Sequence, residues 1–207
     1  MLVVARHGRT AWNAEGRFQG WADVALDAEG RHQSARLAAD LAADPVILGT
    51  GPVDRVWSSD LRRSRETADA VAAALGATVS VDRSLREVDV GPWEGLTLSQ
   101  VRERFPEQYR AWSSGPEARR ELRRGGGETL GEAGSRVADA IWAKPDPAGP
   151  ATIVVGHGMA LQTALDLLAE RGLIDLLPPA PHLGNAEYLL LNVRAGGRWA
   201  GRGGAGP

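Results

Sequence analysis

Apolar residues along the chain fall into short continuous runs, separated by longer stretches in which they recur every three or four positions. The runs at 2–5 and 151–155 contain β-branched residues and end next to charge or glycine, which is typical of buried central strands. Further strands are predicted at 55–58, at 78–81 and within 185–193. Continuous rather than alternating apolar runs indicate a sheet that is covered on both faces.

The longer stretches predict helices, and several of these have recognisable ends. Asp27 is a typical N-cap for a helix that runs to about Leu41, and another helix is predicted from about Asp60 to a stop near Gly76. A helical pattern also follows the segment 156–158. Two more helix starts carry a hydroxyl and a third-position side chain that can satisfy each other's backbone donors, Thr97 with Gln100 and Thr129 with Glu132.

Alternation of strands and helices predicts an α/β fold, a single-domain three-layer α/β/α sandwich with a mostly parallel sheet. With 207 residues, one domain over 1–200 is the simplest organisation. We expect an inserted helical or loop cap at about 98–127, where the polar, Arg-rich part from 106 onward could equally be a solvated surface loop. The glycine-rich tail 201–207 is expected to be disordered.

Composition removes several classes of function. The chain has 24 Lys and Arg against 26 Asp and Glu, so its summed field does not attract nucleic acid. It has no cysteine, which excludes disulfides, thiolate metal sites and cysteine nucleophiles and agrees with a reducing compartment, so a cytoplasmic location is the default. No apolar stretch approaches the roughly 20 residues that a spanning helix needs, so we expect a soluble protein without a membrane partner.

Two of the four histidines have matching positions in the predicted fold. His7 and His157 each follow a buried strand directly and each stand next to glycine. Because ligands of open α/β sheets bind outside the carboxyl ends of the strands, these two side chains are expected to meet at one crevice. A lone histidine in such a place is more often a turn residue satisfied by its neighbours.

Arginines near the same strand ends favour the catalytic interpretation. Arg6 precedes His7, and Arg63 lies on the first turns of the helix that follows Ser58 and Ser59. A guanidinium keeps its charge and presents forked donors that match a tetrahedral oxyanion, so a phosphate pocket is predicted here. Of the neighbouring arginines Arg62, Arg63 and Arg65, two are expected to lie on a solvated helix face.

The motifs along the chain, taken together, resemble the histidine phosphatase superfamily, whose fold is phosphoglycerate-mutase-like. The resemblance spans residues 2 to about 193 and favours the phosphatase branch. It is carried, in family order, by Arg6-His7-Gly8 with Thr10 and Asn13, Gln19-Gly20 with Asp23, Ser58 to Arg63 with Thr67-Ala68, Leu85-Arg86-Glu87 with Gly91, Trp93-Glu94-Gly95 and Thr97, Gly126 to Thr129, Gly156-His157-Gly158, and Gly184-Asn185-Ala186.

This resemblance implies a role for each matching residue. His7 is implied to be the nucleophile that becomes phosphohistidine, with its other ring nitrogen held by a backbone carbonyl, and Glu87 to be the proton donor and later the base. Arg6, Arg63 and His157 are implied to clamp the phosphate. The remaining substrate-binding positions are Asn13, Gln19, Gly20, Gly158 and Asn185, and no metal or other cofactor is implied.

Three alternatives to a phosphatase remain open. A bisphosphoglycerate-dependent mutase is disfavoured because such mutases carry a motif of the type Asn-Glu-Arg-His-Tyr-Gly around the acidic residue, whereas Glu87 lies in Arg-Glu-Val-Asp-Val-Gly. A catalytically idle member that binds phosphoesters or proteins is disfavoured because His7, Glu87 and His157 are all present. A metal hydrolase is disfavoured because no histidine pair has metal spacing and the arginines would repel a cation.

The substrate is expected to be a small phosphorylated metabolite of the sugar phosphate or glycerate phosphate type. The motifs also resemble the glucosyl-3-phosphoglycerate phosphatases of this family, and a homodimer is left open. Arg119, Arg120, Arg123 and Arg124 either meet a second anionic group of the substrate or form a solvated basic stretch. Trp12, Trp21 and Trp93 either line a sugar-sized pocket or fill core and rim. His32 and His182 are treated as surface or packing residues, with His182 close enough to Asn185 to reach the rim.

Overall fold

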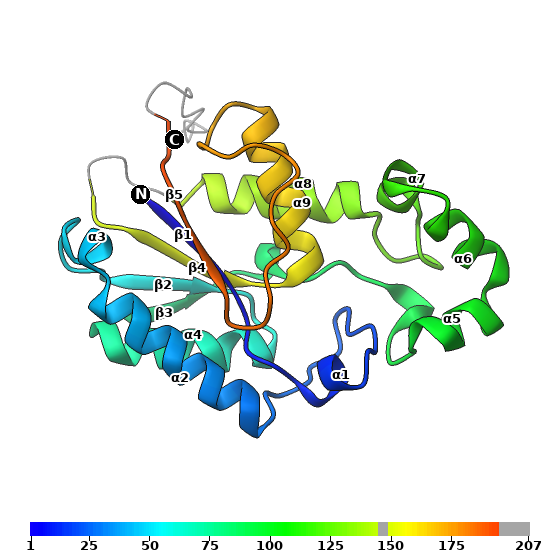
Figure 1. Cartoon of the computed structure of the whole chain (residues 1–207), viewed down its shortest axis with the longest axis horizontal. Helices are drawn as coiled ribbons and strands as arrows, with labels where there is room; N and C mark the ends of the chain where they lie inside the picture. The colour runs from blue at the N-terminus through cyan, green and yellow to red at the C-terminus, as the bar shows by residue number, and fades with distance from the viewer. Residues whose placement is uncertain (145–148, 195–207) are drawn as a thin grey trace, which may run out of the picture.

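A five-stranded mixed sheet forms the centre of the computed structural model, which describes residues 1–144 and 149–194 (Figure 1). The strand order is β3-β2-β4-β1-β5, and only β5 runs antiparallel, against β1. The strands are β1 (Leu2–Arg6), β2 (Arg55–Ser58), β3 (Thr78–Val81), β4 (Thr152–Gly156) and β5 (Tyr188–Leu191). The predicted α/β class with a mostly parallel sheet is confirmed.

Helices cover both faces of the sheet and extend past one end of it. Figure 1 shows α2 and α4 on one side, α8 and α9 on the other, and α5 to α7 grouped beyond the sheet. The α-helices are α1 (Ala11–Ala14), α2 (Ala28–Ala43), α3 (Pro45–Leu48), α4 (Arg62–Leu75), α5 (Leu98–Arg104), α6 (Pro106–Ser113), α7 (Pro116–Glu121), α8 (Leu130–Trp142) and α9 (Gly158–Glu170). Two 3₁₀ turns, η1 (Arg83–Leu85) and η2 (Gly91–Trp93), lie between β3 and α5.

The central strands divide their side chains between two cores. In β1, Leu2 and Val4 belong to the core under α8 and α9, whereas Val3 and Ala5 belong to the core under α2 and α4. Successive side chains of a strand point to opposite faces, so a strand covered on both sides must be apolar at every position. This requirement explains the continuous apolar run at the start of the chain.

Most predicted helix ends agree with the structure. The side chain of Asp27 accepts a hydrogen bond from the backbone N–H of Gly30, and α4 ends at Gly76, which has a φ of 67°. Both reciprocal caps, at Thr97 and at Thr129, are present. Gly30 weakens the helical pattern, but a Cβ there would lie 1.9 Å from the carbonyl oxygen of Arg9, so the close approach of the chain requires glycine.

The segment expected to form a cap contains two helices that the sequence did not resolve. α6 and α7 begin with Pro106 and Pro116 at the first helical position, where proline is favoured because its missing N–H would be unpaired anyway. Side chains of this region pack around a third apolar cluster centred on Trp93. The domain limits remain a prediction, and the tail 201–207 lies outside the described residues.

No helix in the described ranges 1–144 and 149–194 is both long and apolar enough to cross a membrane.

Close packing of α8 on α9 generates a prediction about Gly134. A Cβ at this position would lie 2.4 Å from Cγ2 and 2.8 Å from Cβ of Thr163, and a β-branched helical side chain cannot move aside freely. Gly134→Ala should therefore lower the free energy of unfolding by ~1–2 kcal/mol. This value is the cost of overpacking minus the gain in helix propensity from glycine to alanine. Urea denaturation provides the measurement.

Gly131→Ala is the matched control in the same helix. The nearest atoms to its added Cβ are at 3.7 Å, so only the propensity gain applies and stability should rise slightly. Equal effects of the two substitutions would contradict the close contact of Gly134 with Thr163.

Candidate active site

The pairing of β1 with β4 brings the two sequence-predicted histidines together. Arg6 is paired with Gly156 across the two strands, and the backbone N–H of His7 donates to the carbonyl of Gly156 at 3.0 Å. The rings of His7 and His157 consequently lie with their centroids 5.2 Å apart. Both side chains are buried, with relative exposures of 2% and 0%.

The hydrogen bonding of His7 selects one ring nitrogen for chemistry. Its Nδ1 lies 2.7 Å from the carbonyl oxygen of Gly8, so in the neutral ring Nδ1–H donates and Nε2 keeps its lone pair. Burial lowers the pKa of His7 well below its ordinary value, and the charges of Arg63 and Arg6 lower it further. A neutral imidazole with a free Nε2 is the form that a nucleophile requires.

Two arginines, Arg63 and the partly buried Arg6, supply permanent positive charge beside His7. Arg63 is fully buried and donates to the carbonyls of Gly20 and Ala22, and Arg6 donates to the carbonyl of Leu183. Burial lowers the pKa of Arg63 to about 10, so it stays protonated at neutral pH. The Nε of both arginines is buried without a hydrogen-bond acceptor in the described part of the chain. These two groups are suited to bind an anion.

His157 is held by a residue that the sequence analysis did not assign. Its Nε2 lies 2.7 Å from Oγ of Ser59, while its Nδ1 is buried without a partner among the described residues. Burial and then the charge of Arg63 lower the pKa of His157 well below its ordinary value. Ser59 directly follows β2 and belongs to the motif Ser58 to Arg63, and that position is the signal that could have identified it.

Glu87 approaches the site from the other side, and its carboxyl group lies at the N-terminus of α9. Its Oε1 accepts hydrogen bonds from the backbone N–H groups of Val88 and Ala160, both at 2.9 Å, and its Oε2 accepts from that of Met159 at 3.3 Å. These three backbone donors fix the orientation of the carboxyl group. The side chain is 7% exposed, and it reaches the cavity that the arginines also line.

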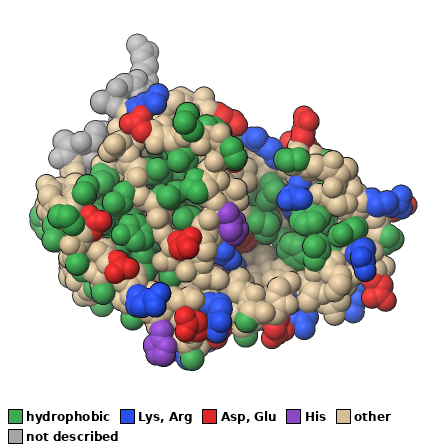
Figure 2. Space-filling model, viewed as in Figure 1, with side chains coloured by type: hydrophobic (Ala, Val, Ile, Leu, Met, Phe, Trp, Pro, Cys, Tyr) green, Lys and Arg blue, Asp and Glu red, His purple; other side chains and the backbone are tan. Residues whose placement is uncertain are grey.

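One cavity of about 130 Å³ joins most of the predicted site. Figure 2 shows the surface hollowed between the sheet-bearing part and the cap, with histidine and cationic side chains at the edge of the hollow. The predicted residues that line this cavity are Arg6, His7, Asn13, Gln19, Gly20, Arg63, Glu87 and Gly158. Arg17, Phe18, Met159 and His182 complete its wall, so His182 does reach the site.

Asn13 and Asn185 have different positions relative to this cavity. The side-chain oxygen of Asn13 accepts from the backbone N–H and the hydroxyl of Thr10 and from Nδ2 of Asn185. Among the described residues, the Asn13 side-chain NH₂ group has no acceptor and can donate to a ligand. Asn185 does not line the cavity and instead donates to the carbonyl of His7. Asn185 therefore supports the backbone of the predicted nucleophile.

Glycines allow close approaches in the cavity wall. A Cβ at Gly158 would lie 3.2 Å from Nε of Arg6, so a larger residue would push against the guanidinium. Gly20 has a φ of 50°, and a Cβ there would lie 2.7 Å from Val90. Both positions therefore favour glycine for steric reasons.

The arginines of the cap have mostly local partners. Arg119 stacks on Trp112 at 4.1 Å, and Arg123 pairs with Glu132. Arg124 differs, since it is fully buried over the ring of Trp93 and its three nitrogens have no hydrogen-bond acceptor among the described residues. Of the two alternatives left open for these arginines, the solvated basic stretch is wrong for Arg124, because this side chain packs inward.

The tryptophans near the motifs do not line the cavity. Trp93 is fully buried in the apolar cluster of the cap, and Trp21 donates its Nε1–H to the carbonyl of Glu87. A Cβ at Gly95 would lie 3.4 Å from the ring of Trp12. Within the described ranges, no group of three or more His, Cys, Asp or Glu side chains is arranged to hold a metal ion.

Comparison with protein families and curated proteins gives consistent similarities. The family model described as histidine phosphatase superfamily (branch 1) matches residues 2–202. The chain is 38% identical over 165 residues to phosphoglycerate mutase-like protein 4 of Arabidopsis thaliana, covering 78% of this chain and 68% of that protein. It is 32% identical over 136 residues to phosphoserine phosphatase 1 of Hydrogenobacter thermophilus, covering 66% of this chain but only 60% of that protein.

Solved structures are also similar over most of the chain. Mycobacterial glucosyl-3-phosphoglycerate phosphatase in complex with VO3 has a TM-score of 0.72 and 29% identity, covering 90% of this chain and 88% of that chain. YhfR of Bacillus stearothermophilus has a TM-score of 0.71 and 29% identity, covering 82% and 79%.

The two buried histidines predict a pH dependence of stability. Their pKa values are lowered in the folded protein, whereas the unfolded chain titrates near the ordinary value of about 6.5. Below that pH the unfolded state binds more protons, so the free energy of unfolding should fall as pH is lowered, by at most about 1.4 kcal/mol per pH unit for each histidine. Urea denaturation between pH 7.5 and pH 5 measures this slope.

His157→Gln should show a shallower slope than the wild type, because one of the two titrating groups is absent. His32→Gln is the matched control, since His32 is exposed. A slope for His157→Gln as steep as that of the wild type would show that the buried imidazole does not resist protonation.

Proposed function

Because the chain belongs to the histidine phosphatase superfamily, we propose that it hydrolyses small phosphate monoesters through a phosphohistidine at His7. The supporting observation is the set of buried donors around one neutral imidazole. Nε of Arg6, Nε of Arg63 and Nδ1 of His157 are all without acceptors among the described residues, and both arginines share the cavity with His7. A phosphoryl group would satisfy these donors while its phosphorus faces Nε2 of His7.

The first half of the reaction forms the phosphoenzyme. Nε2 of His7 attacks phosphorus with its lone pair, the ester P–O bond breaks, and the protonated carboxyl of Glu87 gives its proton to the leaving oxygen. The carbonyl of Gly8 holds the Nδ1 proton throughout. Arg6 and Arg63 stabilise the charge on the equatorial oxygens.

The second half restores the enzyme. Glu87, now a carboxylate, takes a proton from water while the water oxygen bonds to phosphorus and the P–N bond to His7 breaks. Inorganic phosphate leaves and His7 returns to its neutral form. A mutase would use a hydroxyl of the substrate in place of this water.

Substitution of the two proposed reacting residues tests this mechanism. His7→Ala should abolish turnover and acid-labile phosphoprotein, because the nitrogen that attacks phosphorus is removed. Glu87→Gln should slow turnover by roughly 10²–10⁴-fold, most strongly for poor leaving groups that need a proton. Hydrolysis of phenyl phosphates and acid-quench labelling are the measurements. An active His7→Ala enzyme would overturn the mechanism, and His32→Ala serves as an exposed control.

We further infer that the substrate carries a second anionic group, as a glycerate phosphate does. The cavity of about 130 Å³ is below the range of about 300–1,000 Å³ for drug-sized ligands, which favours a small phosphoester. The guanidinium of Arg124 has no hydrogen-bond acceptor among the described residues, and the charge of Glu87 acts on it electrostatically. Arg124 does not line the cavity, so it would meet a ligand only after the cap shifts. The similarity to glucosyl-3-phosphoglycerate phosphatase makes that compound a candidate.

A comparison of 3-phosphoglycerate with glycerol 3-phosphate tests this second group. Arg124→Met should raise KM for 3-phosphoglycerate by about 10–100-fold, the value of a hydrogen bond to a charged group, and leave glycerol 3-phosphate unchanged. If both substrates are unaffected and the variant is more stable, Arg124 is only an unfavourable buried charge.

Three further measurements test the alternatives to a phosphatase. Transfer of phosphate between glycerate phosphates in the presence of added bisphosphoglycerate would identify a mutase. Loss of activity after strong chelation would identify a metal hydrolase, and the absence of turnover of any phosphoester would identify an idle member.

A further inference from the structure

The segment that carries Glu87 has no regular secondary structure of its own. Residues 86–90 connect the two 3₁₀ turns η1 and η2. A general acid must lie within hydrogen-bond reach of one particular oxygen, so a loop that carries it needs support from outside. The contacts around this loop identify that support.

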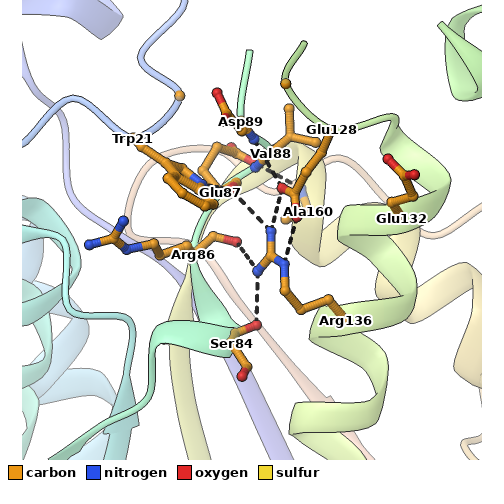
Figure 3. Close-up of polar contacts among 12 residues, drawn as sticks. Trp21, Ser84, Arg86, Glu87, Val88, Asp89, Glu128, Glu132, Arg136 and Ala160 are labelled. Atoms are coloured by element: carbon orange, nitrogen blue, oxygen red, sulfur yellow. Dashed lines mark hydrogen bonds and ion pairs between the residues drawn. The ribbon is translucent and has the colours of Figure 1, made fainter. Parts of the chain in front are cut away.

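Arg136 points from α8 toward the backbone of this segment and binds it (Figure 3). Its Nη1 donates to the carbonyls of Ser84 at 3.0 Å and Arg86 at 3.1 Å, and its Nη2 donates to the carbonyl of Glu87 at 3.3 Å. One planar guanidinium thus contacts three carbonyls of the segment that leads to the reacting carboxyl. A lysine ammonium cannot match this planar arrangement of donors.

Glu128 orients Arg136 and holds the other side of the loop. Nε of Arg136 donates to Oε1 of Glu128 at 2.9 Å, and Nη2 donates to Oε2 at 2.6 Å, a bidentate pair with both side chains about a quarter exposed or less. Oε2 of Glu128 also accepts from the backbone N–H of Asp89, whose carbonyl accepts from the N–H of Glu128. Together, Arg136 and Glu128 bind the chain on both sides of Glu87.

Trp21 contacts the same peptide unit from another direction. Its Nε1–H donates to the carbonyl of Glu87 at 2.8 Å, so that oxygen accepts from two side chains. The guanidinium of Arg86 lies 4.9 Å from the Trp21 ring and pairs with both carboxylate oxygens of Asp60. The peptide of Glu87 is therefore fixed independently of its side chain.

Helices α8 and α9 together determine where the Glu87 carboxylate can lie. α8 holds the Glu87 carbonyl through Arg136, and the N-terminus of α9 holds the carboxylate through Met159 and Ala160. These two helices pack directly on each other, so the two attachments keep a constant separation. A displacement of about 1 Å at a reacting group can cost on the order of 10²-fold in rate.

We propose that Arg136, oriented by Glu128, is a positioning residue that aims Glu87 at the leaving-group oxygen. This inference rests on the proposed function. Arg136 lies outside the cavity wall, so it acts through Glu87 and not on the substrate. Its contribution should therefore matter only for steps in which Glu87 transfers a proton.

A series of substituted phenyl phosphates tests the proposal in Arg136→Gln. The value of kcat/KM reports the steps up to loss of the leaving group. In this variant kcat/KM should fall at least about tenfold for the poorest leaving groups and much less for nitrophenyl phosphate. The dependence of log(kcat/KM) on leaving-group pKa should become steeper. With nitrophenyl phosphate, phosphohistidine should accumulate, because Glu87 also activates water.

Double substitution shows whether Arg136 acts through Glu87. In a Glu87→Gln background, Arg136→Gln should lower kcat/KM little further, since the group that Arg136 positions no longer transfers a proton. Additive losses, or an equal loss for every leaving group, would overturn the proposal. If Glu87→Gln itself shows no dependence on the leaving group, the proposed function fails instead.

Two further variants separate positioning from charge and from folding. Arg136 also carries a charge that contributes to the lowered pKa of His157, although burial is the main cause and Arg136 is the last of the contributing charges. Arg136→Lys retains this charge and loses the planar set of guanidinium donors. If Arg136→Lys has the same leaving-group dependence of kcat/KM as the wild type, the charge suffices and Arg136 does not position Glu87. Glu128→Gln should steepen the leaving-group dependence in the same direction, and it provides the test if Arg136→Gln does not fold.

Arg171→Gln is the matched control. Arg171 pairs at 2.9 Å with Asp139 of α8, the helix that also carries Arg136, and the two side chains are 42% and 72% exposed. Among the described residues, neither side chain has a hydrogen bond or ion pair to the Glu87 loop. An exposed pair contributes little to stability, so activity and leaving-group dependence should remain those of the wild type. A steeper dependence in this control would show that any disturbance of α8 produces the effect.

Discussion

In the centre of the sheet, β1 pairs in parallel with β4 in a register that sets Arg6 opposite Gly156. Every part of the site depends on this pairing, because it brings His7 and His157 to the same edge from positions far apart in the chain. The buried ends of both strands also exclude water from the two rings. A slip of one residue would turn the side chains of β1 to the opposite faces of the sheet and separate the site.

Burial gives the site its electrostatic character. Two imidazoles kept neutral lie beside two arginines that remain protonated, so positive charge and an uncharged nucleophile coexist in a small volume. In water the arginine charges would be screened, whereas in a buried site they act strongly on a bound anion. The same burial makes protonation of the histidines unfavourable, so the features that suit phosphoryl transfer also make stability depend on pH.

The acid side of the site is built differently from the nucleophile side. His7 follows a central strand directly, whereas Glu87 lies in an irregular segment. Its position depends on Arg136 of α8, on Trp21 and on backbone N–H groups of α9. Sheet hydrogen bonds position the first, and a network around Arg136 positions the second. The cap packs on this network through Trp93, so the loop that bears Glu87 lies between the sheet and the cap.

The sequence by itself determined the strands, the main helix starts and the pair of histidines, because apolar periodicity, caps and strand-end positions are local signals. Only the tertiary structure decided the strand order, the place of Ser59 beside His157, the support of His7 by Asn185 and the binding of the Glu87 loop by Arg136. Those contacts join residues distant in the chain, often through backbone carbonyls, which every residue possesses and no sequence pattern marks. Arg124 illustrates the same limit, since whether an arginine in a polar stretch faces solvent or the interior depends on packing by segments elsewhere in the chain.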